Sequence, residues 1–128
     1  MLLKGYNLGR WQVQVTDDFG RWWDQLTSAQ QIAIDASVRL LEQLGPHLSR
    51  PYADTAEGSR HANLKELRTQ CQGRPLRTFF AFDPRRCAIL LIGGDKTGDE
   101  RFYERMISVA DRLYDEHIKQ LRKEGLIP

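Results

Sequence analysis

Three short apolar stretches joined by tight connections lie in the middle of this 128-residue chain and constrain its fold more than any other feature. They are residues 64–68 (LKELR), 76–84 (LRTFFAFDP) and 88–96 (AILLIGGDK). Gly73 lies in the first connection and Pro84 in the second, as is typical of hairpin turns. The pattern predicts three strands that pair in sequence, and the third, which is apolar on both faces, is expected to be central.

The positive charge of the chain is concentrated on these strands. Residues 60–105 carry ten Lys or Arg against six Asp or Glu, whereas residues 1–59 carry five against seven. The net charge of +2 for the whole chain hides this asymmetry. A basic sheet favours an anionic partner such as nucleic acid, although an imbalance of this size is also common on surfaces that bind nothing.

The residues before these strands predict one more strand and two helices. Residues 11–15 (WQVQV) alternate apolar and polar side chains, as an amphipathic strand does. Apolar side chains then recur at helical spacing over residues 19–26. Ser28 and Gln31 form a capping-box pattern for a second helix, which Gly45-Pro46 would end. We expect the two helices to form a hairpin that covers one face of the sheet.

A long loop and a final helix complete the predicted fold. Residues 47–62 contain Pro, Gly and several small polar residues, and they are expected to form the loop. A second capping-box pattern over residues 97–100 precedes a long helix, and residues 1–10 and 119–128 are expected to be loose ends. The prediction is a single α+β domain over residues 1–128, with a small, mainly antiparallel sheet packed against an N-terminal helical hairpin and a C-terminal helix.

Composition narrows the class of protein further. Apolar residues make up 41% of the chain and charged residues 28%, which are ordinary values for a soluble globular domain. Cys71 and Cys87 are too few and too far apart for a disulfide framework or a zinc motif, and Cys87 is expected to pack as a small hydrophobe. With no membrane-length apolar run and no signal-peptide core, the protein is expected in the cytoplasm, with no metal, cofactor or membrane partner.

Several motifs, in their order and spacing, resemble those of the RelE/ParE toxin superfamily, and especially its HigB-like, phage-related branch. They are the Trp-rich segment 18–23 (DFGRWW), the Lys65-Glu66-Leu67-Arg68 motif, the approach from Gly73 to Arg77, the strand at residues 88–96 and a helix that contains Tyr103. The resemblance covers residues 11 to about 118. It implies that essentially the whole domain has a RelE-like toxin fold.

The resemblance implies the toxin of a type II toxin–antitoxin pair. Many members are mRNA interferases that cut messenger RNA in the ribosomal A site without a metal. There the RNA 2′-hydroxyl attacks its own phosphodiester, which needs a base, cations for the phosphate oxygens and an acid for the leaving 5′-oxygen. The implied partners are mRNA, the ribosome and a cognate antitoxin of the helix-turn-helix DNA-binding type. Two alternatives remain on this scaffold: a ParE-like poison of DNA gyrase and a catalytically silent protein-binding module.

Three basic residues match phosphate-contacting positions of the family. Arg77 matches the arginine at the scissile phosphate, where a planar guanidinium can hold two oxygens at once. Arg68 fits a second phosphate contact, and Lys96 fits a basic position after the central strand. Each has a structural alternative, since Arg77 could lie beside Asp83 or Glu66, Arg68 could be neutralised by Glu66, and Lys96 could be a solvated turn lysine.

Four further residues complete the candidate site. Tyr103 matches a tyrosine that stacks on or orients a nucleotide, but its spacing also suits a core residue. Lys65 could act as the base if neighbouring cations lowered its pKa. His61 enters the sheet just before Lys65 and is the histidine to test as acid or base, although a lone loop histidine is often a bystander. Arg101 is a further candidate for phosphate binding.

The nuclease interpretation depends on one geometric expectation. Arg68, Arg77, Lys96 and Tyr103 must gather in one open, positively charged hollow, although they are distant in sequence. An Arg77 locked in an internal ion pair would leave the interpretation resting on family resemblance alone. The chain also departs from ribosome-dependent relatives, which carry several lysines or histidines at the site, because here Asp95 stands next to a single lysine.

Overall fold

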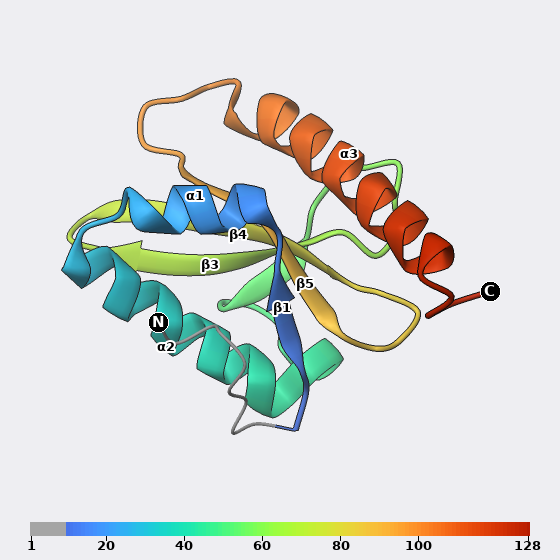
Figure 1. The fold of residues 1–128 in the computed structure, drawn as a ribbon. Helices are drawn as coiled ribbons and strands as arrows, with labels where there is room; N and C mark the ends of the chain where they lie inside the picture. Colours follow the sequence, from blue (N-terminus) through green and yellow to red (C-terminus); the bar gives the residue numbers. More distant parts are fainter. Residues whose placement is uncertain (1–9) are drawn as a thin grey trace.

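Residues 10–128, which the computed structural model describes, form a five-stranded mixed sheet with helices on both faces (Figure 1). The predicted lead-in at residues 1–9 lies outside the described part. The strand order is β1-β5-β4-β3-β2. The strands are β1 (Val13–Val15), β2 (Ala53–Thr55), β3 (Lys65–Cys71), β4 (Arg74–Phe82) and β5 (Ala88–Asp95). All neighbours are antiparallel except β1 and β5, which are parallel, so the predicted α+β class is confirmed.

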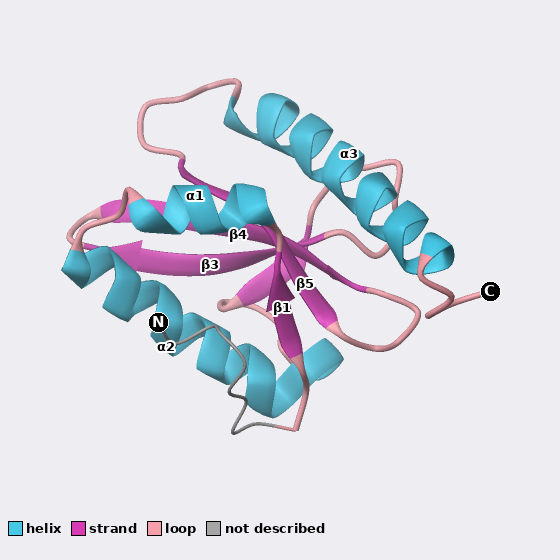
Figure 2. Ribbon diagram, viewed as in Figure 1, coloured by secondary structure: helices cyan, strands magenta, loops and turns pink. Residues whose placement is uncertain are grey.

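The helices form one layer on each face of the sheet, as Figure 2 shows in cyan against the magenta strands. They are α1 (Asp17–Asp24), α2 (Ser28–Leu44), the short 3₁₀ helix η1 (Gly45–His47) and α3 (Phe102–Lys123). Phe19, Ile34 and Val38 of α1 and α2 share one core with the sheet, whereas Met106 and Ala110 of α3 belong to a second core. The predicted helical hairpin over one face is therefore confirmed. No helix within residues 10–128 is long and apolar enough to cross a membrane.

Strand β5 has a helix layer on each side because its side chains alternate between the two cores. Ala88 and Leu90 pack with α1 and α2, and Ile89 and Leu91 pack with α3. All four are buried, as the apolar run had predicted for a central strand. The hairpin from β3 to β4 turns over two residues, at positions 72 and 73. Their φ angles are 53° and 79°, and positive values at both positions are typical of two-residue hairpin turns.

Two glycines in β5 allow the helices to approach the sheet closely. A Cβ atom on Gly93 would lie within 2.1 Å of the Trp22 ring of α1, and one on Gly94 would lie 2.9 Å from the Phe102 ring of α3. The atoms that approach these glycines most closely are therefore aromatic rings of the two helix layers. Because Phe102 begins α3, the contact with Gly94 fixes where Tyr103, the next residue, stands relative to β4 and β5.

The structure corrects several local predictions. The expected loop at residues 47–62 contains β2, whose three residues carry too little pattern to be recognised. The cap of α2 is Thr27 with Gln30, one residue earlier than predicted. Residues 97–100 form no capping box. The Thr97 hydroxyl donates a hydrogen bond to the Asp95 carboxylate, and α3 begins only at Phe102. The helix also continues to Lys123 with Leu121 buried, so residues 119–123 are not a loose end.

Candidate functional site

Arg68 of β3 and Arg77 of β4 stand directly opposite each other in the antiparallel ladder. Side chains alternate along a strand, so Glu66, two residues before Arg68, lies on the same face. Phe79, two residues after Arg77, belongs to the core beneath α3 and identifies that face. The register of one hairpin therefore places two guanidinium groups and one carboxylate side by side. They lie close to the first turn of α3.

The Glu66 carboxylate is at the centre of the site and is only 5% exposed. Its Oε2 accepts hydrogen bonds from Arg68 through Nη2 at 3.0 Å and Nε at 3.3 Å. Its Oε1 accepts from the Tyr103 hydroxyl at 2.7 Å and lies 3.4 Å from Arg77 Nε. These bonds to Glu66 raise the pKa of the Arg68 guanidinium above its ordinary value. Every oxygen of this buried carboxylate is thus satisfied, as burial of a charge requires.

Tyr103 joins this group from the first turn of α3. Its ring packs edge-on against Phe79 and Phe102, with centroids 6.1 and 5.3 Å away. Its hydroxyl accepts a hydrogen bond from Arg77 Nε at 3.2 Å while it donates to Glu66. Burial raises the pKa of Tyr103, and the Glu66 carboxylate raises it further, so the phenol stays protonated at neutral pH. Tyr103 is therefore both a core aromatic and a member of the polar site.

Lys96 completes the site from the chain segment that follows β5. Its backbone N–H donates to the carbonyl of Pro75 at 3.1 Å, which holds this segment against β4. Its Nζ lies 5.3 Å from the centroid of the Tyr103 ring, within the range of a cation–π contact. We call Glu66, Arg68, Arg77, Lys96 and Tyr103 the Glu66 cluster. The expectation that the four candidate residues gather in one place is confirmed by these contacts.

The second half of that expectation, one open hollow that all four residues share, is wrong, and Arg77 is largely covered. The Arg77 side chain is only 10% exposed, lies against Glu66 and donates through Nη1 to the carbonyl of Leu76 at 3.1 Å. The structural alternative, an arginine beside Glu66, is therefore what the structure shows. Arg68 is 30% exposed and is the more accessible of the two arginines.

A groove of about 630 Å³ leads to the cluster along the edge of β3. Strand β2 pairs with β3 only from Lys65 to Leu67, and the groove begins where that pairing ends. Its lining includes Arg68, Gln70 and Arg77, together with Tyr52 and the small side chains of α2. Arg77 thus lines an open groove even though most of its surface is covered.

Three predicted site residues lie outside the cluster. Lys65 has the opposite parity to Glu66 and is paired with Phe80, which places it on the face covered by α1 and α2. His61 Nε2 lies 2.8 Å from the Asp115 carboxylate, about 18 Å along α3 from Tyr103. Arg101 is exposed just before α3, and its nearest acidic partner is Glu104 at 3.6 Å.

The sequence predicted Glu66 only as a possible partner of Arg68 or Arg77 and did not identify it as the centre of the site. The signal that could have identified it is the pairing register, since Glu66, Arg68 and Arg77 share a face only if the hairpin turns at Gly73. Within the described residues, no three His, Cys, Asp or Glu side chains are grouped as a metal ion would require. The cluster is therefore organised around guanidinium, phenol and ammonium groups with one carboxylate.

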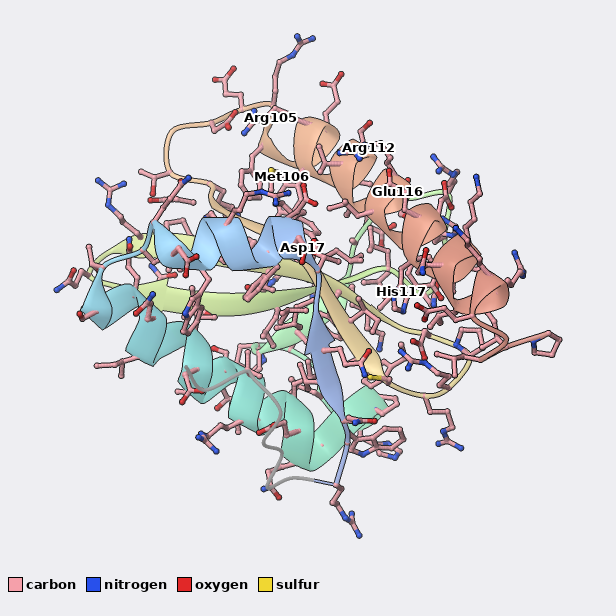
Figure 3. The ribbon with its side chains drawn as sticks, viewed as in Figure 1. Asp17, Arg105, Met106, Arg112, Glu116 and His117 are labelled. Atoms are coloured by element: carbon pink, nitrogen blue, oxygen red, sulfur yellow. The ribbon has the colours of Figure 1, made fainter. Side chains whose placement is uncertain are left out.

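A second polar group lies at the opposite end of β4 and holds the fold together. The buried Asp83 carboxylate accepts hydrogen bonds from Arg85 at 2.7 Å and from the backbone N–H of Cys87 at 3.3 Å. His117 Nε2 on α3, labelled in Figure 3, lies 2.9 Å from the same carboxylate. Although burial acts in the opposite direction, these hydrogen bonds keep the pKa of Asp83 below its ordinary value. They tie the turn after β4 to α3.

The fold is a mixed sheet with a helical hairpin on one face and a single helix on the other. Basic and aromatic side chains gather where β3, β4 and α3 meet. These two features define a RelE-like α+β domain. Residues 21–115 match the family described as phage-derived protein Gp49-like (DUF891). The chain therefore belongs to the Gp49-like family, and its class is that of the HigB-like toxins of toxin–antitoxin systems.

Two relatives from Mycobacterium tuberculosis carry toxin names. The chain is 43% identical over 101 residues to the protein named as toxin HigB2, and the match covers 77% of this chain and 50% of HigB2. It is 43% identical over 93 residues to the protein named as toxin HigB3, covering 72% of this chain and 80% of HigB3. The chain thus spans half the length of one relative and most of the other. No solved structure matches the chain.

Proposed function

We propose that this toxin is a metal-independent endoribonuclease that cleaves mRNA at the Glu66 cluster. The observation that supports this most is the convergence of Arg68, Arg77, Lys96 and Tyr103 from three strands or strand ends and one helix. Two guanidinium groups and one neutral phenol contact a single carboxylate there, and the ammonium group of Lys96 lies over the phenol ring. Such a site retains positive charge for a phosphodiester, which is the group that RNA cleavage must hold.

Each side chain has a chemical task in this proposal. Arg68 and Arg77 bind the scissile phosphate through planar guanidinium groups, which suit two oxygens at once. Lys96 adds positive charge where the phosphate oxygens become more negative as the 2′-hydroxyl attacks. The Tyr103 hydroxyl keeps its proton at neutral pH and can donate it toward the leaving 5′-oxygen. As the 2′-hydroxyl attacks phosphorus, its proton would pass to solvent water, and the bond from phosphorus to the 5′-oxygen would break as that oxygen takes the Tyr103 proton. The products would be a 2′,3′-cyclic phosphate and a free 5′-hydroxyl.

The proposed partners follow from the same class of protein. A toxin of this kind implies a cognate antitoxin, and we expect a helix-turn-helix DNA-binding protein. We expect mRNA to be cut on the ribosome, where the substrate is held extended for the toxin. The excess of basic residues between positions 60 and 105 favours binding to the phosphate-rich surface of RNA.

One observation favours a rival function. Because Arg77 lies against Glu66 and is largely covered, it could serve only to stabilise the hairpin, and the domain would then be a silent protein-binding module. A gyrase poison on the same fold would also need no nuclease site. The three functions differ in what happens when the chain is produced without an antitoxin.

The test is to induce the chain alone in bacteria and map transcript 5′ ends. Arg112 supplies the matched control, since it is an exposed arginine that pairs with Glu116 at 3.0 Å along α3 (Figure 3). Wild type and Arg112→Ala should arrest growth and create new 5′-hydroxyl ends. Arg77→Ala and Arg68→Ala should reduce those ends at least 100-fold, with circular dichroism confirming that each variant is folded.

The other outcomes identify the rivals. Growth arrest with DNA damage signalling but no new 5′ ends would contradict the nuclease and support a gyrase poison. Normal growth with the full-length folded chain present would support the silent module. New 5′ ends that persist in the folded Arg68→Ala and Arg77→Ala variants would move the nuclease site away from the Glu66 cluster.

A further inference from the structure

We propose that the Glu66 carboxylate holds the arginine donors that an RNA phosphate needs for binding, so that Glu66 is a built-in competitor of the substrate. This proposal rests on the function proposed above and adds a regulatory feature to the same site. Glu66 would set the affinity for RNA by holding the arginines in the free toxin. A phosphate would then bind by taking over their donors.

The first argument is the set of groups around the carboxylate. Glu66 is contacted by two guanidinium groups and one phenol hydroxyl, at distances from 2.7 to 3.4 Å. These are the same groups to which the proposed function assigns the phosphate, and no other anion is needed to orient them in the free protein. A carboxylate and a phosphate both present oxygens that accept two guanidinium N–H bonds, so the same donors fit either group.

The second argument is the charge balance. One carboxylate is contacted by two cationic side chains, Arg68 and Arg77, and a third, Lys96, lies over the adjoining Tyr103 ring. Asp54 lies 3.5 Å from Arg68, but it is closer to Arg50, at 2.6 Å, and is largely committed to that partner. The site is therefore cationic even with Glu66 in place, and it has the capacity to attract a second anion.

The third argument is access. Arg68 and Arg77 line the groove along the edge of β3, whereas Glu66 itself is not among its lining residues. A phosphate in the groove would thus reach the two guanidinium groups that hold the carboxylate. Exchange of partners then needs only rotation of the arginine side chains, because the backbone of β3 and β4 is held by their ladder.

The test compares Glu66→Gln with Glu104→Gln in the purified full-length chain. Both changes remove one negative charge near the start of α3, but Glu104 is 75% exposed and its ion-pair partner is Arg101, at 3.6 Å. Titration with inorganic phosphate, followed by the NMR signals of arginine Nε–H groups, should show at least tenfold tighter binding for Glu66→Gln. Glu104→Gln should stay within twofold of wild type. A merely structural Glu66 would give weaker binding on substitution, and that result, or unchanged affinity, would overturn the proposal.

Wild-type protein provides a second measurement that does not depend on any variant folding. Added phosphate should shift the Nε–H signals of Arg68 and Arg77, because these groups change partner. Signals that stay fixed while phosphate saturates the protein would also overturn the proposal.

An RNA arm separates this proposal from the function on which it rests. A short RNA with a 2′-O-methyl group at every ribose cannot be cleaved, so its binding can be measured alone. In a plot of the logarithm of affinity against the logarithm of salt concentration, Glu66→Gln should give a steeper slope than wild type. The difference should be about 0.7 for each additional RNA phosphate that the variant neutralises. If wild type neither cleaves nor binds RNA, the nuclease function fails, yet the phosphate titration still decides whether Glu66 competes for the anion. If wild type cleaves RNA and Glu66→Gln binds no tighter, only the competitor role fails.

Discussion

The hydroxyl of Tyr103 on α3 donates a 2.7 Å hydrogen bond to the carboxylate of Glu66 on β3, 37 residues earlier in the chain. This bond connects the first turn of the C-terminal helix to the centre of the polar site. Tyr103 was predicted to be either a nucleotide-contacting residue or a core residue, and the structure combines features of both. Its ring packs in the core while its hydroxyl completes the Glu66 cluster. Packing of α3 and geometry of the site therefore depend on each other.

Tyr103→Phe should destabilise the protein by about 1–3 kcal/mol, because the buried Glu66 loses a donor that no water can easily replace. Urea unfolding provides the measurement. Tyr52→Phe is the matched control, since Tyr52 is 49% exposed and its change should stay within about 0.5 kcal/mol. Equal stability of the two variants would show that the bond to Glu66 contributes nothing.

Gly93→Ala should cost about 1–3 kcal/mol, because the added methyl group would meet the Trp22 ring of α1 and force that helix outward. Thermal or urea unfolding would measure the loss. Gly20→Ala is the opposite case, since Gly20 lies inside α1 with open space around its Cα. That variant should gain about 0.5–1 kcal/mol from helix propensity. A loss at Gly20 as large as that at Gly93 would contradict this account of the packing.

Lys65→Ala and His61→Ala should keep full toxicity, because the first side chain lies on the other face of the sheet and the second is bonded to Asp115. Growth arrest on induction is the measurement, with Lys96→Ala as the variant expected to lose activity. Loss of toxicity in a folded Lys65→Ala protein would show that Lys65 takes part in the activity although it lies outside the Glu66 cluster.

Alkaline pH should weaken the fold through Cys87. Burial, with a further contribution from Asp83, raises the pKa of this thiol from an ordinary value of 9.0 to about 11. The folded state therefore keeps a proton that the unfolded state releases, and the stabilisation is complete below pH 9 and lost as pH rises toward 11. Wild type should lose about 1.4 kcal/mol per pH unit more than Cys87→Ala over this interval. Parallel stability curves for the two proteins would disprove the coupling.

Much of the fold follows from local patterns in the sequence. The alternation in β4 and the apolar run of β5 are set by burial on one or two faces, and such periodicity is visible without coordinates. Strand β2 was missed because three residues give no period, and its pairing with β3 is determined by tertiary contacts. The helix caps were misplaced because Thr27 and Ser28 are both suitable cap residues, and only backbone geometry distinguishes them.

The site was less predictable than the fold. Family resemblance identified Arg68, Arg77, Lys96 and Tyr103, and the structure brings them together, although their roles remain proposals. The sequence could not show that Glu66 would bind three of them, because that depends on hairpin register and on the position of α3 together. For the same reason, Lys65 looked equivalent to its neighbours in sequence but lies on the other face.

The parallel pairing of β1 with β5 has a consequence for how the chain is made. Val13 aligns with Ala88, so β1 lacks its partner in the sheet until β5 has been synthesised, some 75 residues later. Contacts between such distant segments slow folding, since a long loop must close before they form. A growing chain on its own ribosome would thus lack both a complete sheet and the helix that carries Tyr103, and a harmful activity would be withheld until α3 has been synthesised.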